Sequence, residues 1–387
     1  MLRVRQDALG KLITNATEKY LASSDWEDFV RNIRDNSDLP PTVPSIPHRA
    51  GPLLNRIRRH GVPTTCTTGP WSTERRDAAV SRGPHRSSHD HTDFVRDEFV
   101  DFLSKAFWTI LPYRLVHHLH DLRLSPLGVV PQRERRPRLI VDLSFWGING
   151  ETLPLAPSEA MQFGRTLQRV LQRIVDSNPA FGAVFLSKID ISGGFYRIQI
   201  SPRGIPRLGV LLPQPYDEEP MVAFPLVLPM GWVNSPPYFC AATETAADLI
   251  NHHPVQTDTP HRLEDQALGS TANSPITPPS FTRRHRRLKR PVRYADVYVD
   301  DFILLSQGSP AVRRRLMRQT LATIDEIFRP ASSADNPFRQ EPVSLKKLAA
   351  SKRAGVRKLQ KILGELRSMA LAIPGSRGLF SPLQNAM

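Results

Sequence analysis

The sequence predicts an α+β fold in which an antiparallel sheet carries helices on one face. Residues 295–305 form the apolar run Ala-Asp-Val-Tyr-Val-Asp-Asp-Phe-Ile-Leu-Leu, in which strand-forming residues flank two adjacent carboxylates. This pattern indicates a β-hairpin with an acidic tip. Residues 94–110 and 311–328 instead repeat apolar side chains at helical spacing. Both kinds of element are therefore expected.

The first part of the chain is expected to be irregular and then helical. Residues 36–90 are rich in Pro, Arg, His, Ser and Thr, which indicates a loosely packed or partly disordered extension. An amphipathic helix is expected between residues 91 and 118. A strand pair follows at 127–131 and 138–143, separated by the basic turn Arg133-Glu134-Arg135-Arg136.

The middle of the chain predicts further strands and helices. They are a helix over 161–174, strands over 183–189, 196–200 and 221–227, and a helix over 238–250. Pro236 or Pro237 can open that last helix, because proline is tolerated at the first helical position. Helices are also expected at 311–328 and 351–371.

Residues 251–293 interrupt this pattern and predict a flexible insertion. The segment is full of His, Pro, Thr and Ser and ends in the basic run 283–290. That run has three interpretations of equal standing: a nuclear localisation patch, a nucleic-acid clamp or a charged loop.

The composition favours a polyanionic partner. The 387 residues include 52 Lys+Arg and 37 Asp+Glu, a formal net charge of +15. Lysines and arginines release counterions when they meet phosphates, although a solvated basic surface gives the same charge. Two cysteines, Cys66 and Cys240, form no disulfide framework. An intracellular protein, cytoplasmic or nuclear and without a membrane partner, is expected, since no apolar segment or secretory signal is evident.

The acidic pair Asp300-Asp301 is hard to explain by packing, because burying unpaired charge is costly. Magnesium removes the difficulty, since it prefers hard oxygen ligands. Asp190 ends a second apolar strand. Carboxylates from separate strands can hold two ions about 3.5–4 Å apart for phosphoryl transfer. Gly193 and Gly194, which follow, allow backbone N–H groups to approach a triphosphate.

Four motifs, in order, resemble those of reverse transcriptases. Asp190 with Phe195 five residues later, Leu-Pro-Met-Gly-Trp-Val-Asn-Ser-Pro at 228–236, and Tyr-Val-Asp-Asp at 298–301 resemble the three palm motifs. Arg-Leu-Ile-Val-Asp at 138–142 resembles the fingers motif. The detail is most similar to the DIRS-like, tyrosine-recombinase group of retrotransposons. Taken together the motifs are specific, whereas each alone is not.

The resemblance implies a metal centre. Asp190 and Asp300 would be the principal ligands of Mg²⁺, with Mn²⁺ as an alternative ion. The backbone carbonyl of Ile191 would assist, and Asp301 would be an auxiliary carboxylate. Crowded carboxylates hold raised, coupled pKa values until a divalent cation favours their ionised forms.

The resemblance also implies a nucleotide site. Phe195 would be a steric gate against the 2′-hydroxyl of ribonucleotides. Arg138 would pair with the β- and γ-phosphates, and Met230 and Gly231 would line the nucleotide and template side. Taken singly, such an aromatic residue is more often core and a glycine pair more often a turn.

The implied organisation is that of a right-hand polymerase with fingers and palm, and with the thumb partial or missing. The expected divisions are an N-terminal extension (1–90), a fingers-like region (91–180), a first palm part (181–250), the basic insertion (251–293), a second palm part (294–345) and a C-terminal helical remnant (346–387). The remnant would include a leucine-rich helix near residues 362–367.

The implied function is RNA-directed DNA polymerisation, the two-metal transfer of nucleotides from dNTPs to a primer on an RNA or DNA template. The intact carboxylates favour this function. Neither a primer grip nor an RNase H-like acidic set is recognisable, which favours a truncated, catalytically inactive remnant that still binds nucleic acid. Other element-encoded proteins would then supply RNase H and recombinase.

Overall fold

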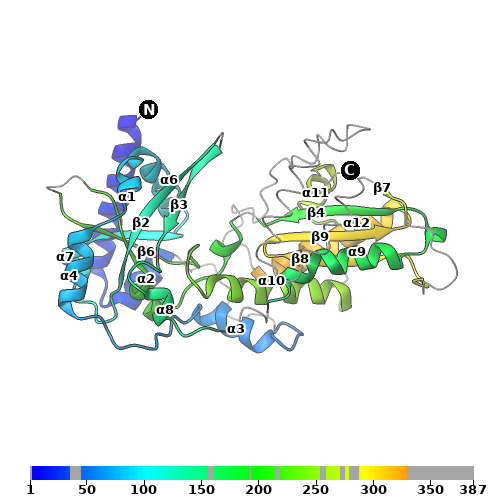
Figure 1. Cartoon of the computed structure of the whole chain (residues 1–387), viewed down its shortest axis with the longest axis horizontal. Helices are drawn as coiled ribbons and strands as arrows, with labels where there is room; N and C mark the ends of the chain where they lie inside the picture. The colour runs from blue at the N-terminus through cyan, green and yellow to red at the C-terminus, as the bar shows by residue number, and fades with distance from the viewer. Residues whose placement is uncertain are drawn as a thin grey trace, which may run out of the picture. The chain divides into compact units, whose positions relative to one another are not determined.

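The computed structural model describes residues 2–34, 45–133, 135–155, 161–191, 193–214, 218–252, 259–270, 275–278 and 287–328. The chain forms two compact units, each with its own sheet (Figure 1). Met1–Ser158 and Gly193–Ala241 belong to the first unit, and Glu159–Ser192 and Ala242–Pro330 to the second. The architecture is α+β, as predicted, with antiparallel and mixed sheets. The predicted divisions at residues 180 and 250 do not coincide with these units, because residues 193–241 contribute two strands to the first sheet.

The first unit contains a five-stranded mixed sheet in the order β1-β6-β5-β2-β3. Its strands are β1 (Trp108–Pro112), β2 (Leu124–Gln132), β3 (Arg135–Val141), β5 (Gly209–Leu211) and β6 (Met221–Pro225). The pair β2–β5 is parallel and the other pairs are antiparallel. Phe99, Trp108, Ile110 and Leu127 belong to the core beside this sheet. The predicted hairpin at 127–143 is confirmed.

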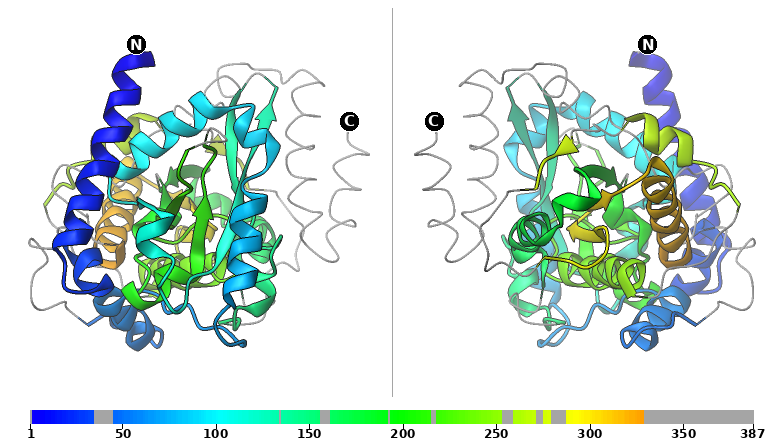
Figure 2. Two further views of the ribbon diagram at one scale, coloured as in Figure 1. Left: turned by 90° about the vertical axis from the view of Figure 1, so that its left-hand side faces the viewer. Right: turned by 90° about the vertical axis from the view of Figure 1, so that its right-hand side faces the viewer.

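Helices surround this sheet. They are α1 (Leu2–Ala22), α2 (Trp26–Arg34), α3 (Gly51–His60), α4 (Thr73–Arg82), α5 (Arg86–His89), α6 (Thr92–Ser104), α7 (Tyr113–Val116), α8 (Ile148–Glu151) and the 3-10 helices η5 (Gly194–Arg197) and η6 (Pro202–Leu208). The long helix α1 packs against α6 and β1 (Figure 2).

Residues 45–90 are more ordered than their composition suggests. They form α3, α4 and α5 and bury Leu54, Ile57 and Trp71. Polar contacts also tie this segment to the sheet: the buried Arg123 donates to the backbone carbonyls of Thr68 and Gly69 and to the carboxylate of Glu151. Helices this short bury only one or two side chains each, so they leave almost no periodic signal in the sequence.

Two sequence predictions differ from the structure in this unit. The helix expected over 91–118 ends at Ser104, and Trp108–Pro112 is a strand instead. All five residues of that strand are buried, and a continuous apolar run cannot be distinguished from a helix by periodicity. The strand expected over 196–200 begins as the 3-10 helix η5 and makes only single bridges at Gln199 and Ile200.

The second unit contains a four-stranded antiparallel sheet in the order β7-β4-β9-β8. Its strands are β4 (Val184–Asp190), β7 (Pro275–Ile276), β8 (Arg293–Tyr298) and β9 (Asp301–Gln307). Its helices are the 3-10 helices η3 (Phe163–Arg165) and η4 (Pro179–Phe181), with α9 (Thr166–Asp176), α11 (Glu264–Ser270) and α12 (Pro310–Phe328). Helix α10 (Ser235–His252) begins in the first unit and ends in the second. The predicted acidic hairpin is confirmed.

Helices cover both faces of this sheet, whereas we expected them on one face only. Val170 and Ile174 of α9 pack with Val184 and Leu305, which lie on one face. The alternate residues Phe302 and Leu304 are also buried, and α12 contacts β8 and β9 (Figure 1). In the part of the chain that the structure describes, helices therefore pack on both faces of this sheet.

Some predicted segments lie partly or wholly outside the described residues. The insertion at 251–293 is described in part and contains α11 and β7. The helix expected at 351–371 and the whole 346–387 region lie outside them. None of the helices that the structure describes is long and apolar enough to cross a membrane.

Candidate metal centre

The strand register of the second unit brings three carboxylates together. Asp190, the last residue of β4, lies directly opposite Asp301, the first residue of β9. Directly opposed residues project to the same face of an antiparallel sheet. Asp300 precedes Asp301 in the turn. One ligand oxygen from each of Asp190, Asp300 and Asp301 lies within 4.8 Å of the others.

The turn that carries Asp300 has a strained backbone. Tyr298 pairs with Asp301, so Val299 and Asp300 form a two-residue connection between β8 and β9. The φ angle of Val299 is 56°, in the left-handed region that a β-branched residue rarely adopts. Such strain costs about 1–3 kcal/mol and clusters at functional sites. The N–H of Ile191 donates to the carbonyl of Asp300 at 3.3 Å, which ties the turn to the end of β4.

The carboxylates influence one another electrostatically. Desolvation raises the pKa of Asp300, and the negative charge of Asp301 raises it further. A backbone hydrogen bond and the ammonium of Lys188 oppose this increase in the pKa. Lys188 itself lies close to Asp301, with 2.7 Å between Nζ and Oδ1.

This donor set fits a hard divalent cation. All three acidic side chains are partly exposed, so an ion with its own water ligands can reach them. Mg²⁺ is usually held by one or two carboxylates and keeps several waters. Nearby positive charge also favours the ionised form of a carboxylate whose pKa is raised.

The predicted gate residue belongs to the first unit. The ring centroid of Phe195 lies 4.8 Å from that of Phe239 on α10, with the planes tilted by 33°. A Cβ atom on Gly194 would lie 2.6 Å from Cζ of the same Phe239 ring. The small size of Gly194 is therefore explained by packing against α10. Gly193 precedes η5 with a φ angle of 58°.

The loop that contains Met230 and Gly231, which we predicted to line the nucleotide, is held by Asn149. This asparagine was not among the predicted site residues. Asn149 donates through Nδ2 to the carbonyl of Gly231 and accepts at Oδ1 from the N–H of Val233, both at 2.9 Å. Gly231 has a φ angle of 98°, and a Cβ there would lie 2.5 Å from the carbonyl oxygen of Val141. Only glycine fits this position. Met230 is exposed beside it.

Arg138 is placed by the β2–β3 hairpin. It lies opposite Val130, and both side chains are exposed. It makes no hydrogen bond or ion pair with any residue in the described ranges. Its guanidinium is therefore available to a ligand.

The predicted site residues fall into two groups. Asp190, Ile191, Asp300 and Asp301 belong to the second unit, whereas Arg138, Gly193, Gly194, Phe195, Met230 and Gly231 belong to the first. Sequence reasoning missed Lys188 and Asn149. A signal for Lys188 was present, because alternation in a strand puts it on the same face as Asp190.

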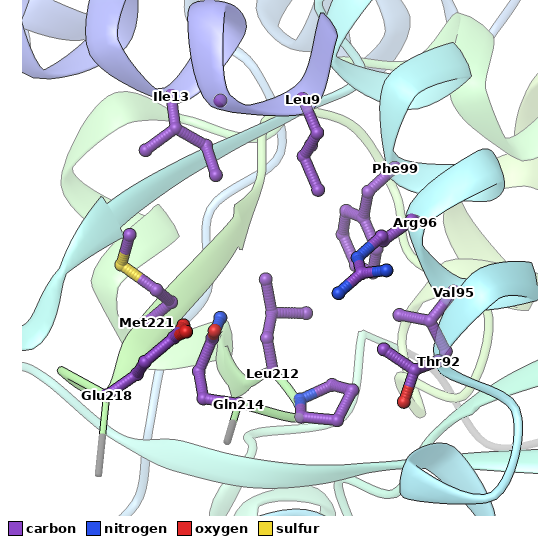
Figure 3. A pocket seen from close by; sticks show the side chains of 12 residues that line it. Leu9, Ile13, Thr92, Val95, Arg96, Phe99, Leu212, Gln214, Glu218 and Met221 are labelled. Atoms are coloured by element: carbon purple, nitrogen blue, oxygen red, sulfur yellow. The ribbon is translucent and has the colours of Figure 1, made fainter. Parts of the chain in front are cut away.

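A cavity of about 330 Å³ in the first unit includes none of these residues (Figure 3). Helices α1 and α6, the segment before β6 and the first residue of β6 line it with both apolar and polar side chains. Arg96 and Glu218 provide charged groups at its edge. None of the predicted metal ligands lines this cavity, so it is not the predicted metal site.

Comparisons with known proteins do not assign the chain. No family model matches it, and no curated protein matches it.

Proposed function

We propose that this chain is an RNA-directed DNA polymerase domain of a retroelement. It would extend a primer 3′ end with dNTPs on an RNA or DNA template. One observation carries the proposal: the register that sets Asp190 against Asp301 brings ligand oxygens from β4, β9 and the β8–β9 turn within 4.8 Å of one another. The order of the four reverse-transcriptase-like motifs supports it.

In this proposal the second unit supplies the palm chemistry. Asp190 and Asp300 would hold Mg²⁺ or Mn²⁺, assisted by the backbone carbonyl of Ile191 and by the charge of Asp301. Bound divalent ions stabilise the attacking and leaving oxygens of an in-line phosphoryl transfer. The strained turn at Val299 and the ladder between β4 and β9 fix the carboxylates before any ion arrives.

The first unit would then bind the nucleotide, in a fingers-like sheet and the loops beside it. The free guanidinium of Arg138 offers a fork of donors for the β- and γ-phosphates. Phe195 would exclude a 2′-hydroxyl, and its ring is supported by Phe239. Asn149 would position the loop at Met230 and Gly231.

The alternative is a catalytically inactive remnant that retains nucleic-acid binding. The observation in its favour is the formal net charge of +15, which suits binding to phosphates whether or not catalysis occurs.

Primer extension separates the two functions. We would assay the purified chain with Mg²⁺, dNTPs and a primed RNA template, beside Asp190→Asn and Asp300→Asn. Asp265→Asn is the matched control, because Asp265 is an exposed carboxylate of the same unit. Incorporation lost only in the first two variants supports the polymerase. Salt-sensitive binding without incorporation supports the remnant, and extension without a template indicates a template-independent nucleotidyltransferase.

A further inference from the structure

The side chain of Lys188 places a positive charge next to the acidic cluster formed by Asp190, Asp300 and Asp301. It lies opposite Ile303, two residues along β9 from Asp301, so it is a diagonal neighbour of Asp301 on the same face. Its Nζ atom is 2.7 Å from Oδ1 of Asp301, and the two side chains are 33% and 26% exposed. The contact is thus partly shielded from water.

The ion pair between Lys188 and Asp301 reduces the repulsion between neighbouring carboxylates. Asp190 and Asp301 lie directly opposite each other, and like charges in that position destabilise a sheet. Asp300 adds a third carboxylate. The Lys188 ammonium compensates one of these charges, and the partner it contacts is Asp301.

We propose that Lys188 is a positioning residue that holds the Asp301 carboxylate by an ion pair and so keeps Asp301 from binding the divalent cation directly. This inference rests on the proposed metal centre. It assigns Asp301 an indirect role, through charge, because one of its oxygens already accepts from the ammonium.

The proposal predicts that the loss of Lys188 strengthens metal binding. Removing an ordinary supporting residue around a metal ion weakens metal affinity. Removing Lys188 should tighten it, because Asp301 is released and a competing positive charge is lost. The same change should lower the rate of primer extension, since a mobile Asp301 would compete for the position of the ion.

Direct Mn²⁺ binding to the full chain, by isothermal titration with Mn²⁺ resonance as a second readout, tests this. We would compare wild type with Lys188→Met, Lys188→Arg and the double variant Lys188→Met/Asp301→Asn. Lys105→Met is the matched control, because Lys105 forms an exposed ion pair with Asp101 at the end of α6. We expect Lys188→Met to bind Mn²⁺ about tenfold more tightly, equivalent to about 1.4 kcal/mol. Lys188→Arg and the double variant should lie near wild type.

The outcomes are separable. Unchanged or weaker Mn²⁺ binding by folded Lys188→Met, or by Lys188→Gln if the first variant fails to fold, overturns the inference. If wild type binds Mn²⁺ but extends no primer, the polymerase proposal fails and the affinities still decide the role of Lys188. Wild-type binding no tighter than that of Asp190→Asn/Asp300→Asn overturns both.

Discussion

The guanidinium of Arg169 on α9 holds the buried carboxylate of Asp296 on β8 through two hydrogen bonds. The distances are 2.7 Å from Nε to Oδ2 and 2.5 Å from Nη2 to Oδ1. The hydroxyl of Tyr294 donates to Oδ2 at 2.7 Å. Asp296 lies opposite Ile303, the residue that also faces Lys188. This clamp therefore fixes the β8–β9 hairpin to α9, one row of side chains from the acidic cluster.

Asp296→Ala should destabilise the protein strongly. The substitution leaves a partly buried Arg169 without its partner, and breaking a buried ion pair costs about 3–5 kcal/mol. Asp265→Ala, which removes an exposed partner of Arg314, should cost less than about 1 kcal/mol. Urea unfolding of the three proteins measures both values. An equal loss of unfolding free energy in Asp296→Ala and Asp265→Ala would show that the Arg169–Asp296 ion pair does not hold the hairpin.

Asp300→Asn should stabilise the protein in the absence of metal. Burial and Asp301 raise the pKa of Asp300 above 3.8, so the folded state binds the proton more tightly than the unfolded state. The stabilising contribution of the protonated form is complete below pH 3.8 and is lost as the pH rises through the raised value. The increase in the free energy of unfolding caused by Asp300→Asn should therefore be largest at neutral pH and vanish in acid. Thermal unfolding across pH in EDTA measures it, and a gain independent of pH would contradict the electrostatic cause.

With a divalent metal bound, wild type should become more stable than Asp300→Asn. A ligand that binds only the folded state stabilises it by about 2.7 kcal/mol at one hundred times its Kd. We expect Mg²⁺ to raise the unfolding midpoint of wild type and to have little effect on Asp300→Asn, with EDTA restoring the metal-free values. A similar rise in both proteins would place the ion somewhere other than the acidic cluster.

The sequence predicted the elements whose signals are local. The acidic hairpin is readable because apolar residues flank the Asp300-Asp301 pair, and α12 because its apolar side chains repeat at helical spacing. Strand β1 was missed because both of its faces are buried, which removes alternation.

The contacts that complete the site depend on register and on distant pairing. Lys188 meets Asp301 only because β4 and β9 align as they do, and Arg169 lies 127 residues from Asp296. Asn149 and Gly231 are 82 residues apart. Strand alternation places Lys188 on the face of Asp190, but no local pattern shows that its partner is Asp301 or that Asn149 and Arg169 reach their partners.

Asn149→Ala should loosen the loop at Gly231. The carbonyl of Gly231 and the N–H of Val233 would each lose an exposed hydrogen bond, at a cost of about 0.5–1.5 kcal/mol per bond in the free energy of unfolding. In the proposed polymerase this loop lines the nucleotide, so the KM for dNTP should rise more than kcat falls. Asn32→Ala, which removes one exposed hydrogen bond to Ser23, is the control. Steady-state extension rates over a range of dNTP concentrations test this, and a fall in kcat at constant KM would contradict it.

In the proposed polymerase, Phe195→Val should admit ribonucleotides. The ring of Phe195 is supported by Phe239, which also closes on Gly194, so the gate has little freedom to move aside. Shortening it opens room for a 2′-hydroxyl, and the preference for dNTP over rNTP, measured as the ratio of the two kcat/KM values, should fall about 10–100-fold. Phe145→Val removes an exposed ring of the same unit and should leave this ratio unchanged. Because a partly folded variant would lose both activities together, the ratio reports the gate itself. An unchanged ratio in a Phe195→Val protein that still extends with dNTPs would remove Phe195 from the nucleotide site and leave its ring as packing against α10.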